Sequence, residues 1–134
     1  MVELETGDIL IFASKGSYLS SLIKYFTQSR ITHVGMVLKD PTWINPCLKG
    51  TFVWESGWEG TPDPQDNHLK LGVQITALED VRKHFKDSDI FVRKIKTPSP
   101  FFWKGSIDKL KKIHEKVYNK PYDLVPNDWI RASL

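Results

Sequence analysis

Several short segments of the chain alternate hydrophobic and polar residues, and one is a continuous apolar run; both patterns predict β-strands. The predicted strands are residues 9–12, 32–38, 51–56, 71–75 and 89–95. The turn signal Gly7-Asp8 precedes the first strand, which is apolar throughout and is therefore expected to be buried. Segments 32–38 and 51–56 are close in the sequence, so we expect them to pair as antiparallel neighbours.

Apolar residues spaced three or four apart predict helices between and after the strands. Three helices are predicted: an early one from Ser17 to about Gln28, a short one through Phe85 opened by a capping box of Thr76 and Glu79, and a late one capped by Ser106 and stopped at Asn119-Lys120-Pro121. One face of the late helix carries Ile107, Leu110, Ile113 and Val117. A further element begins near Pro126 and shows no stop signal before Leu134. We therefore expect one α+β domain over residues 1–134 that is incomplete at its C-terminus.

Composition limits the partners and the location of the protein. The 134 residues carry a net charge of +3, and 40% of them are hydrophobic, which is enough for a single core. Lysines cluster only on the amphipathic late helix, which favours a solvated helix face over a nucleic-acid or membrane-surface contact. We find no signal peptide and no apolar stretch of membrane-spanning length. A cytoplasmic protein is expected, with no nucleic-acid partner and no stable membrane insertion.

His33 is the polar residue whose position is most informative. It lies in the middle of the predicted strand 32–38, with Gly35 on the same face of that strand. The glycine leaves room beside the imidazole for a ligand or a backbone segment to approach. A buried histidine also needs partners for its ring nitrogens. Two interpretations stay open: a core histidine bonded to a neighbouring backbone group, and a general base.

Glu55 lies in the neighbouring predicted strand and is the candidate partner of His33. If the two strands pair, the carboxylate and the imidazole lie on one face within cross-strand reach. A carboxylate bonded to one imidazole nitrogen fixes the tautomer and supports formation of the imidazolium, as general-base catalysis requires. The alternative is that Glu55 only marks the exposed end of its strand.

The other histidines and the single cysteine carry weaker indications. His68, His84 and His114 lack the spacing of metal ligands and no cysteine pair supports zinc, so we expect no metal and no cofactor. Cys47, the only thiol, precedes a strand rather than starting the helix that would lower its pKa. We interpret Cys47 as incidental. If it were the nucleophile, its sulfur would lie close to the His33 ring.

The order of these motifs resembles the circularly permuted NlpC-type papain-like proteins, which include the YiiX/YebB-like permuted amidase group and are akin to the lecithin:retinol acyltransferase-like proteins. The most specific part of the resemblance is Thr32-His33-Val34-Gly35 after the strand that begins with Gly7-Asp8. Residues 53–56, 71–75 and 118–123 fit the later elements of that family. The resemblance implies a papain-like fold, circularly permuted, with a small antiparallel sheet packed against helices.

The resemblance also implies roles for individual residues. His33 would be the general base, Glu55 the residue that orients it, and the nucleophilic cysteine would follow Tyr122-Asp123 on a helix that these 134 residues do not contain. The implied function is a cysteine-dependent hydrolase or acyltransferase that acts on amide or ester bonds of a peptide, a cell-wall peptide or a lipid through an acyl-enzyme. The alternative is a non-catalytic module that binds a small molecule, peptide or lipid in a groove at His33. Its expected walls are Gly35, Trp54 and Trp58, with Trp43 as a further candidate.

Overall fold

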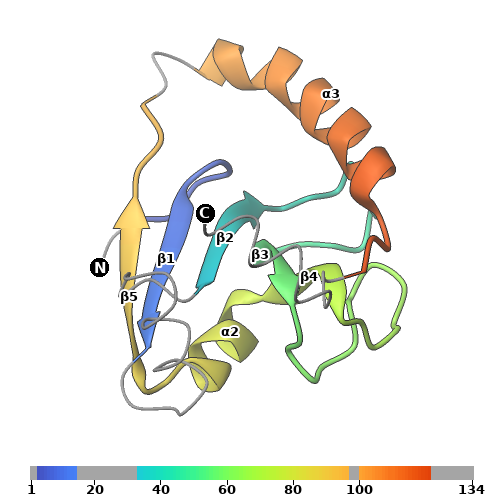
Figure 1. The fold of residues 1–134 in the computed structure, drawn as a ribbon. Coiled ribbons are helices and arrows are strands. Elements are labelled where there is room, and N and C mark those ends of the chain that lie inside the picture. The colour runs from blue at the N-terminus through green and yellow to red at the C-terminus, as the bar shows by residue number, and fades with distance from the viewer. Residues whose placement is uncertain (1–2, 15–32, 97–99, 122–134) are drawn as a thin grey trace, which may run out of the picture.

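The computed structural model describes residues 3–14, 33–96 and 100–121, without the side chains of residues 14 and 100–104. Five strands and two helices are found in this part of the chain (Figure 1). The strands are β1 (Ile9–Ser14), β2 (His33–Lys39), β3 (Thr51–Gly57), β4 (Gly72–Ala77) and β5 (Ser88–Arg93), and the helices are α2 (Leu78–His84) and α3 (Pro100–Val117). All five predicted strands are confirmed. The predicted early helix and the element near Pro126 lie outside the described residues.

The five strands form one antiparallel sheet in the order β4-β3-β2-β1-β5. The expected pairing of β2 with β3 is confirmed, with Met36 opposite Trp54. At its other edge β2 pairs with β1, and His33 lies opposite Phe12. Residues directly opposite each other point to the same face of a sheet, so the register sorts the side chains into two layers. The α+β class predicted from the sequence is therefore the observed one.

The face of the sheet that carries His33 packs against α2. Its core cluster consists of Leu10, Phe12, Val37, Val53 and Val81. Val81 comes from α2, and Leu78 and Phe85 at the two ends of that helix pack against the same cluster. Complete burial of a side chain such as Val81 contributes roughly 1.5–3 kcal/mol. This packing holds α2 against the sheet and brings Phe85 next to His33.

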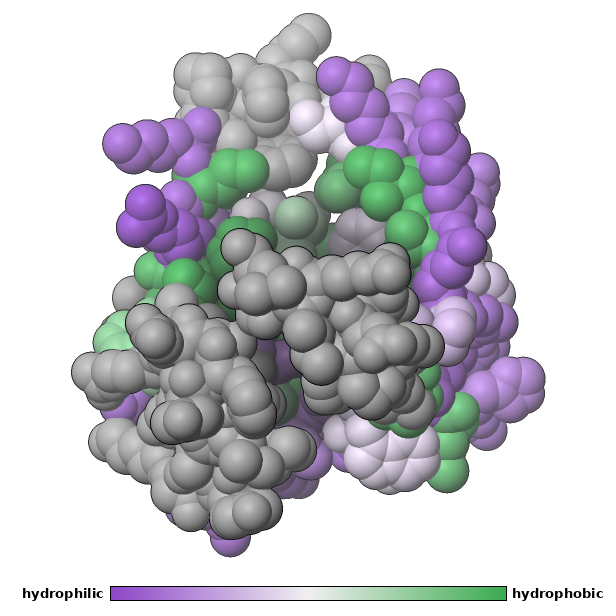
Figure 2. Space-filling model, in the orientation of Figure 1, coloured by the Kyte–Doolittle hydropathy of each residue, from purple (hydrophilic) through white to green (hydrophobic). Residues whose placement is uncertain are grey.

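The opposite face of the sheet carries a second core and the contacts of α3. The second cluster consists of Leu38, Leu48, Phe52 and Ile75, with Trp43, Ile44 and Trp54 partly buried against it. His114 of α3 contacts this face through ring contacts with Trp43 and Trp54. Figure 2 shows hydrophilic residues along the outer side of α3 and hydrophobic residues on its inner side. Neither described helix is long and apolar enough to cross a membrane.

The long connection between β3 and β4 is ordered by a small network of charges. Asp63 is fully buried and forms an ion pair with Lys70, which also pairs with Asp66. The hydroxyl of Tyr118, just after α3, donates a hydrogen bond to Asp66, and Lys70 lies over the Tyr118 ring. Burial opposes these charges, yet the ion pairs hold the pKa of Asp66 below and that of Lys70 above its ordinary value. The network ties the connection to the end of α3.

The N-terminal turn is closed by a second buried carboxylate, Asp8. Gly7 has a φ of 97°, a conformation that glycine adopts at no steric cost, so the predicted turn is confirmed. Asp8 accepts hydrogen bonds from the backbone of Glu5 and Ile95 and from Nζ of Lys94. Burial opposes the charge, but these bonds hold the pKa of Asp8 below its ordinary value. The turn is thereby joined to the residues that follow β5.

The two described helices depart from their predicted starts. α2 has Ala77 at its N-cap and no side-chain cap, so the predicted capping box of Thr76 and Glu79 is wrong. The Thr76 hydroxyl donates to Glu55 instead, and this buried bond outweighs the cap. α3 begins at Pro100, which suits a first helical position because its missing N–H has no intrahelical partner there. The predicted cap Ser106 therefore lies inside the helix, whereas the predicted stop after Val117 is confirmed.

Candidate functional site

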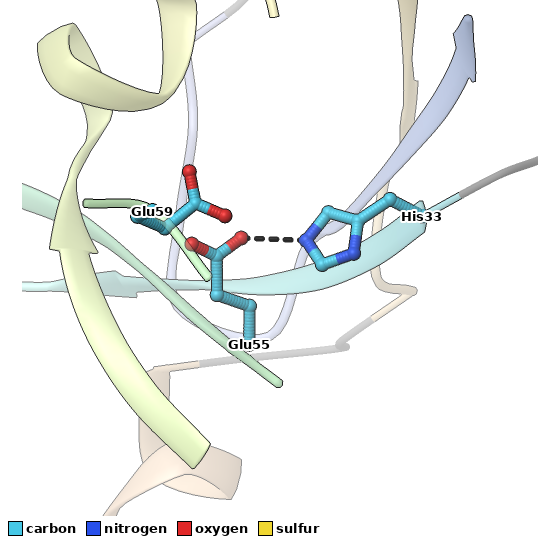
Figure 3. A group of neighbouring side chains, drawn as sticks. All are labelled: His33, Glu55 and Glu59. Carbon is cyan, nitrogen blue, oxygen red and sulfur yellow. Dashed lines mark hydrogen bonds and ion pairs between the residues drawn. The ribbon is translucent and has the colours of Figure 1, made fainter. Parts of the chain in front are cut away.

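The strand pairing brings His33 and Glu55 together on the α2 face of the sheet. Nε2 of His33 lies 2.6 Å from Oε2 of Glu55 (Figure 3). The two residues come from adjacent strands, and β2 and β3 pair in a register that places them on the same face. The prediction that they lie within reach of each other is confirmed. The alternative that Glu55 marks an exposed strand end is wrong, because its side chain is fully buried.

The second oxygen of Glu55 is held as well. The hydroxyl of Thr76 in β4 donates a 2.9 Å hydrogen bond to Oε1 of Glu55, and Thr76 is only 2% exposed. Three adjacent strands therefore build a chain of hydrogen bonds from Thr76 through Glu55 to His33. Since an ionised carboxylate only accepts, His33 donates its Nε2 proton, and its Nδ1 keeps a lone pair. That nitrogen is the one that can take a proton.

The imidazole of His33 is fixed by aromatic rings on the same face. It stacks on Phe85 with ring centroids 5.2 Å apart and planes 8° apart, and it contacts Phe12 at 5.2 Å. These contacts leave 16% of the side chain exposed. The ring is therefore positioned on two sides and yet reaches the surface, as a proton-accepting group requires.

Glu59 completes the site and was not anticipated from the sequence. It is buried after β3 and is 7% exposed. Burial raises the pKa of Glu59 to about 8, together with the charge of Glu55 and a hydrogen bond to it. Glu59 is accordingly protonated at neutral pH. Its Oε2 has no hydrogen-bond partner among the described residues and lies 3.9 Å from Nε2 of His84. The alternating pattern of β3 ends at Gly57, so the sequence did not predict to which face the Glu59 side chain points.

Gly35 and Gly57 leave room for different neighbours on the α2 face of the sheet. A Cβ on Gly35 would come within 2.4 Å of Cγ1 of Val53, so the missing side chain makes room for β3. Of the two predicted occupants of this space, a ligand or a neighbouring segment, the structure shows the neighbouring segment, and Gly35 itself is buried. Gly57 borders the imidazole instead, because a Cβ there would lie 3.5 Å from Cε1 of His33.

The tryptophans expected to wall a groove at His33 divide between the two faces. Trp54 alternates with Glu55 along β3 and therefore points to the opposite face, where it contacts His114. Trp43 packs against the same second core. The expected placement of Trp54 and Trp43 beside His33 is thus wrong. Trp58 directly precedes Glu59 and is 53% exposed, so among the described tryptophans it is one that a ligand can reach.

Cys47 lies apart from His33. Its loop packs onto the second core through Leu48, whereas His33 belongs to the α2 face. The Cys47 side chain is exposed, and its backbone N–H bonds to the side chain of Asn45. The interpretation of Cys47 as incidental to the His33 site agrees with this placement, and the idea that it serves His33 as the nucleophile is wrong.

A second buried histidine was missed in the late helix. His114 is 9% exposed and contacts the rings of Trp43, Trp54 and Tyr118. Burial lowers the pKa of His114, and its Nδ1 has no hydrogen-bond partner among the described residues. Ile113, which was assigned to the apolar face, is 48% exposed. The spacing of His114 from Leu110 and Val117 is the helical spacing that would have identified it.

No protein-family model matches the chain, and no curated protein matches it either. The class that the fold and the site define is therefore an α+β domain whose five-stranded antiparallel sheet carries a carboxylate-bonded histidine.

Proposed function

We propose that this protein is a cysteine-dependent hydrolase or acyltransferase of the circularly permuted papain-like type. It acts on amide or ester bonds of a peptide, a cell-wall peptide or a lipid. The observation that carries the proposal is the 2.6 Å bond between Nε2 of His33 and Oε2 of Glu55, supported by Thr76. The strand with the histidine precedes the strand with the carboxylate, as in the family that the motifs resemble.

The bond to Glu55 determines which nitrogen does the chemistry. Nδ1 of His33 accepts the proton of a thiol, and the thiolate attacks the carbonyl carbon to give a tetrahedral oxyanion. When the oxyanion collapses, the protonated imidazole gives that proton to the leaving amine or alcohol, and an acyl-enzyme is formed. Water or a second acceptor then releases the acyl group with the same proton transfers. Glu55 stabilises the imidazolium in each step.

The proposal requires a thiol at Nδ1 of His33. Cys47 is the only cysteine of the 134 residues and lies with the other core, so the thiol has to come from outside this sequence. The exposed indole of Trp58 is the apolar surface next to Glu59 against which an acyl chain or a side chain of the substrate can pack.

The test uses the product of the whole gene and a panel of activated acyl esters and peptide amides. The expected result is an acyl group on a single cysteine, detected by mass spectrometry of the quenched enzyme. His33→Ala should lower kcat/KM by about 10²–10⁴-fold, the usual contribution of a general base. His68→Ala is the matched control, since His68 lies in the exposed part of the connection to β4. Unchanged turnover by His33→Ala would exclude the proposed base.

A non-catalytic binding module is the second candidate, and the location of Cys47 favours it. No described residue presents a thiol to His33. This function predicts that a bound ligand shifts the NMR resonances of the His33 ring and quenches the fluorescence of Trp58. The ligand itself is recovered unchanged. Acylation of a cysteine by the same compound would exclude the non-catalytic binding function.

A further inference from the structure

His33, Glu55 and Glu59 bring three metal-ligating atoms together on the α2 face of the sheet. One ligand atom from each residue lies within 4.8 Å of those from the other two. Figure 3 shows the carboxyl groups of Glu55 and Glu59 next to each other and the imidazole facing Glu55. The set combines one nitrogen and two oxygen donors, which suits zinc and related divalent transition metals.

The protein brings no cationic side chain to the two carboxyl groups of this cluster among the described residues. Two carboxyl groups, 5% and 7% exposed, lie beside one imidazole, and no lysine or arginine pairs with either of them among the described ion pairs. Oε2 of Glu59 is buried without a hydrogen-bond partner in the same part of the chain. Leaving a buried polar atom unpaired costs about 1–3 kcal/mol. A divalent cation would supply the missing partner of Oε2 of Glu59 and would place a positive charge beside the Glu55 carboxylate.

We infer that His33, Glu55 and Glu59 form a binding site for one divalent transition-metal ion, of which zinc is the representative. Ligand atoms bound to zinc lie roughly 2.0–2.2 Å from the ion, and therefore roughly 3.3 Å from each other in a tetrahedral site. The His33–Glu55 pair has to open slightly from 2.6 Å, while Glu59 turns inward.

The surroundings of the cluster are those of a supported metal site. Thr76 donates to the outer oxygen of Glu55 and so orients this ligand from behind, as outer-shell partners of metal ligands do. Phe12 and Phe85 fix the plane of the imidazole. Nε2 of His84, whose side chain is 43% exposed, lies 3.9 Å from Oε2 of Glu59 and can approach from the solvent side as a fourth ligand.

Metal binding and the proposed acyl transfer use His33 in incompatible ways. An ion on Nε2 needs the lone pair of that nitrogen, so the ring proton has to move to Nδ1, and the base is lost. The inference goes beyond the proposed function and does not depend on it, because it needs no thiol and no substrate. An occupied site would switch off a base at His33, whatever reaction that base serves.

The test is titration of the tag-free 134-residue chain with zinc chloride, followed by calorimetry, with cobalt(II) as the spectroscopic substitute. One zinc ion should bind per chain. Cobalt should give visible absorption bands stronger than those of the aqueous ion, as expected for a low-coordinate site. Long-range ¹H–¹⁵N spectra should show the proton of the His33 ring moving from Nε2 to Nδ1.

Variants assign the binding to these residues. His33→Ala and Glu59→Gln should each weaken zinc binding by about tenfold or more, and Thr76→Val should weaken it by about 10–100-fold through loss of the bond to Glu55. His68→Ala and Glu79→Gln, both exposed and outside the cluster, are matched controls for histidine and carboxylate and should bind as the wild type does. Circular dichroism confirms that each variant is folded.

Two outcomes would overturn the inference: no saturable zinc binding by the folded chain, or equal affinities for the wild type and the folded Glu59→Gln variant. A failure of acyl transfer with intact zinc binding would remove the proposed function and leave the metal site. Active acyl transfer without zinc binding would do the reverse.

Discussion

His33 and His114 are both largely buried, on opposite faces of one sheet, and they differ in what holds them. Nε2 of His33 is bonded to Glu55, which is in turn bonded to Thr76. His114 is surrounded by aromatic rings, and its Nδ1 has no hydrogen-bond partner among the described residues. Burial lowers the pKa of His114, since no carboxylate bonds to its ring within that part of the chain.

The difference separates a chemical role from a structural one. A carboxylate that fixes the tautomer and supports the imidazolium turns a histidine into a base, whereas aromatic packing alone keeps it neutral. The His33 face therefore holds the site, and the His114 face holds α3 in place. Each experiment below tests whether the two histidines can be told apart in this way.

The largest effect on stability is expected for Glu55→Leu. Removing the carboxylate leaves the buried Thr76 hydroxyl and Nε2 of His33 without an acceptor, which costs about 1–3 kcal/mol for each group. Glu55→Gln keeps the shape and part of the hydrogen bonding, and should lose less than Glu55→Leu. The free energy of unfolding in urea measures both. Equal stabilities of wild type and Glu55→Leu would show that the hydrogen-bonded chain does not hold the site.

The opposite result is expected on the other face of the sheet. His114→Leu replaces a buried ring that has an unpaired nitrogen by an apolar side chain, and should raise the free energy of unfolding by about 1 kcal/mol. The contacts with Trp43 and Trp54 can be kept by the leucine. Turnover of the whole gene product should not change. A loss of stability would mean that Nδ1 of His114 forms a hydrogen bond in the folded protein.

The two faces should also respond to pH in opposite directions. The pKa of His114 is lowered from 6.5, so the unfolded chain binds its proton first, and this group makes stability fall as pH drops below about 6.5. The pKa of Glu59 is raised from 4.5 to about 8, so stability falls as pH rises through that interval. His114→Leu should remove the acid-side loss and Glu59→Gln the alkaline-side loss. Urea midpoints from pH 5 to 9 measure both, and unchanged profiles in the two variants would contradict the assignments.

The smallest effect is expected for Cys47→Ser. The thiol is exposed in a loop on the second core, away from His33, so stability should change by less than about 0.5 kcal/mol. The kcat/KM of the whole gene product should equal that of the wild type. A large loss of turnover on this substitution would mean that Cys47 takes part in the reaction after all.

Much of the fold follows from local patterns in the sequence. Alternation located four of the five strands, a short apolar run located β1, and the pattern placed His33 and Glu55 on neighbouring strands. It could not decide whether a ligand or a neighbouring strand fills the space at Gly35, because the clash that this glycine avoids involves Val53 of another strand. It also could not give the direction of Glu59, which lies after the alternating pattern ends.

The capping box shows how a local pattern is overruled. Thr76 and Glu79 have the spacing of a helix cap, but the Thr76 hydroxyl is bonded to Glu55, a residue 21 positions earlier in the chain. A buried carboxylate gains more from a hydroxyl donor than an exposed helix end does, since water can replace the bond only at the exposed end. Rules based on the spacing of residues in the sequence cannot predict contacts of this kind.

The sequence by itself determined the strands, the α+β class and the pair His33 and Glu55, because side-chain alternation and short connections are local properties. Only the tertiary structure decided that Glu59 joins this pair, that His114 is buried, and that Trp54 and Cys47 belong to the other face. The physical reason is that burial and the pKa shifts it causes depend on which distant segments exclude water from a side chain. The pairing of strands across the whole sheet determines which segments these are.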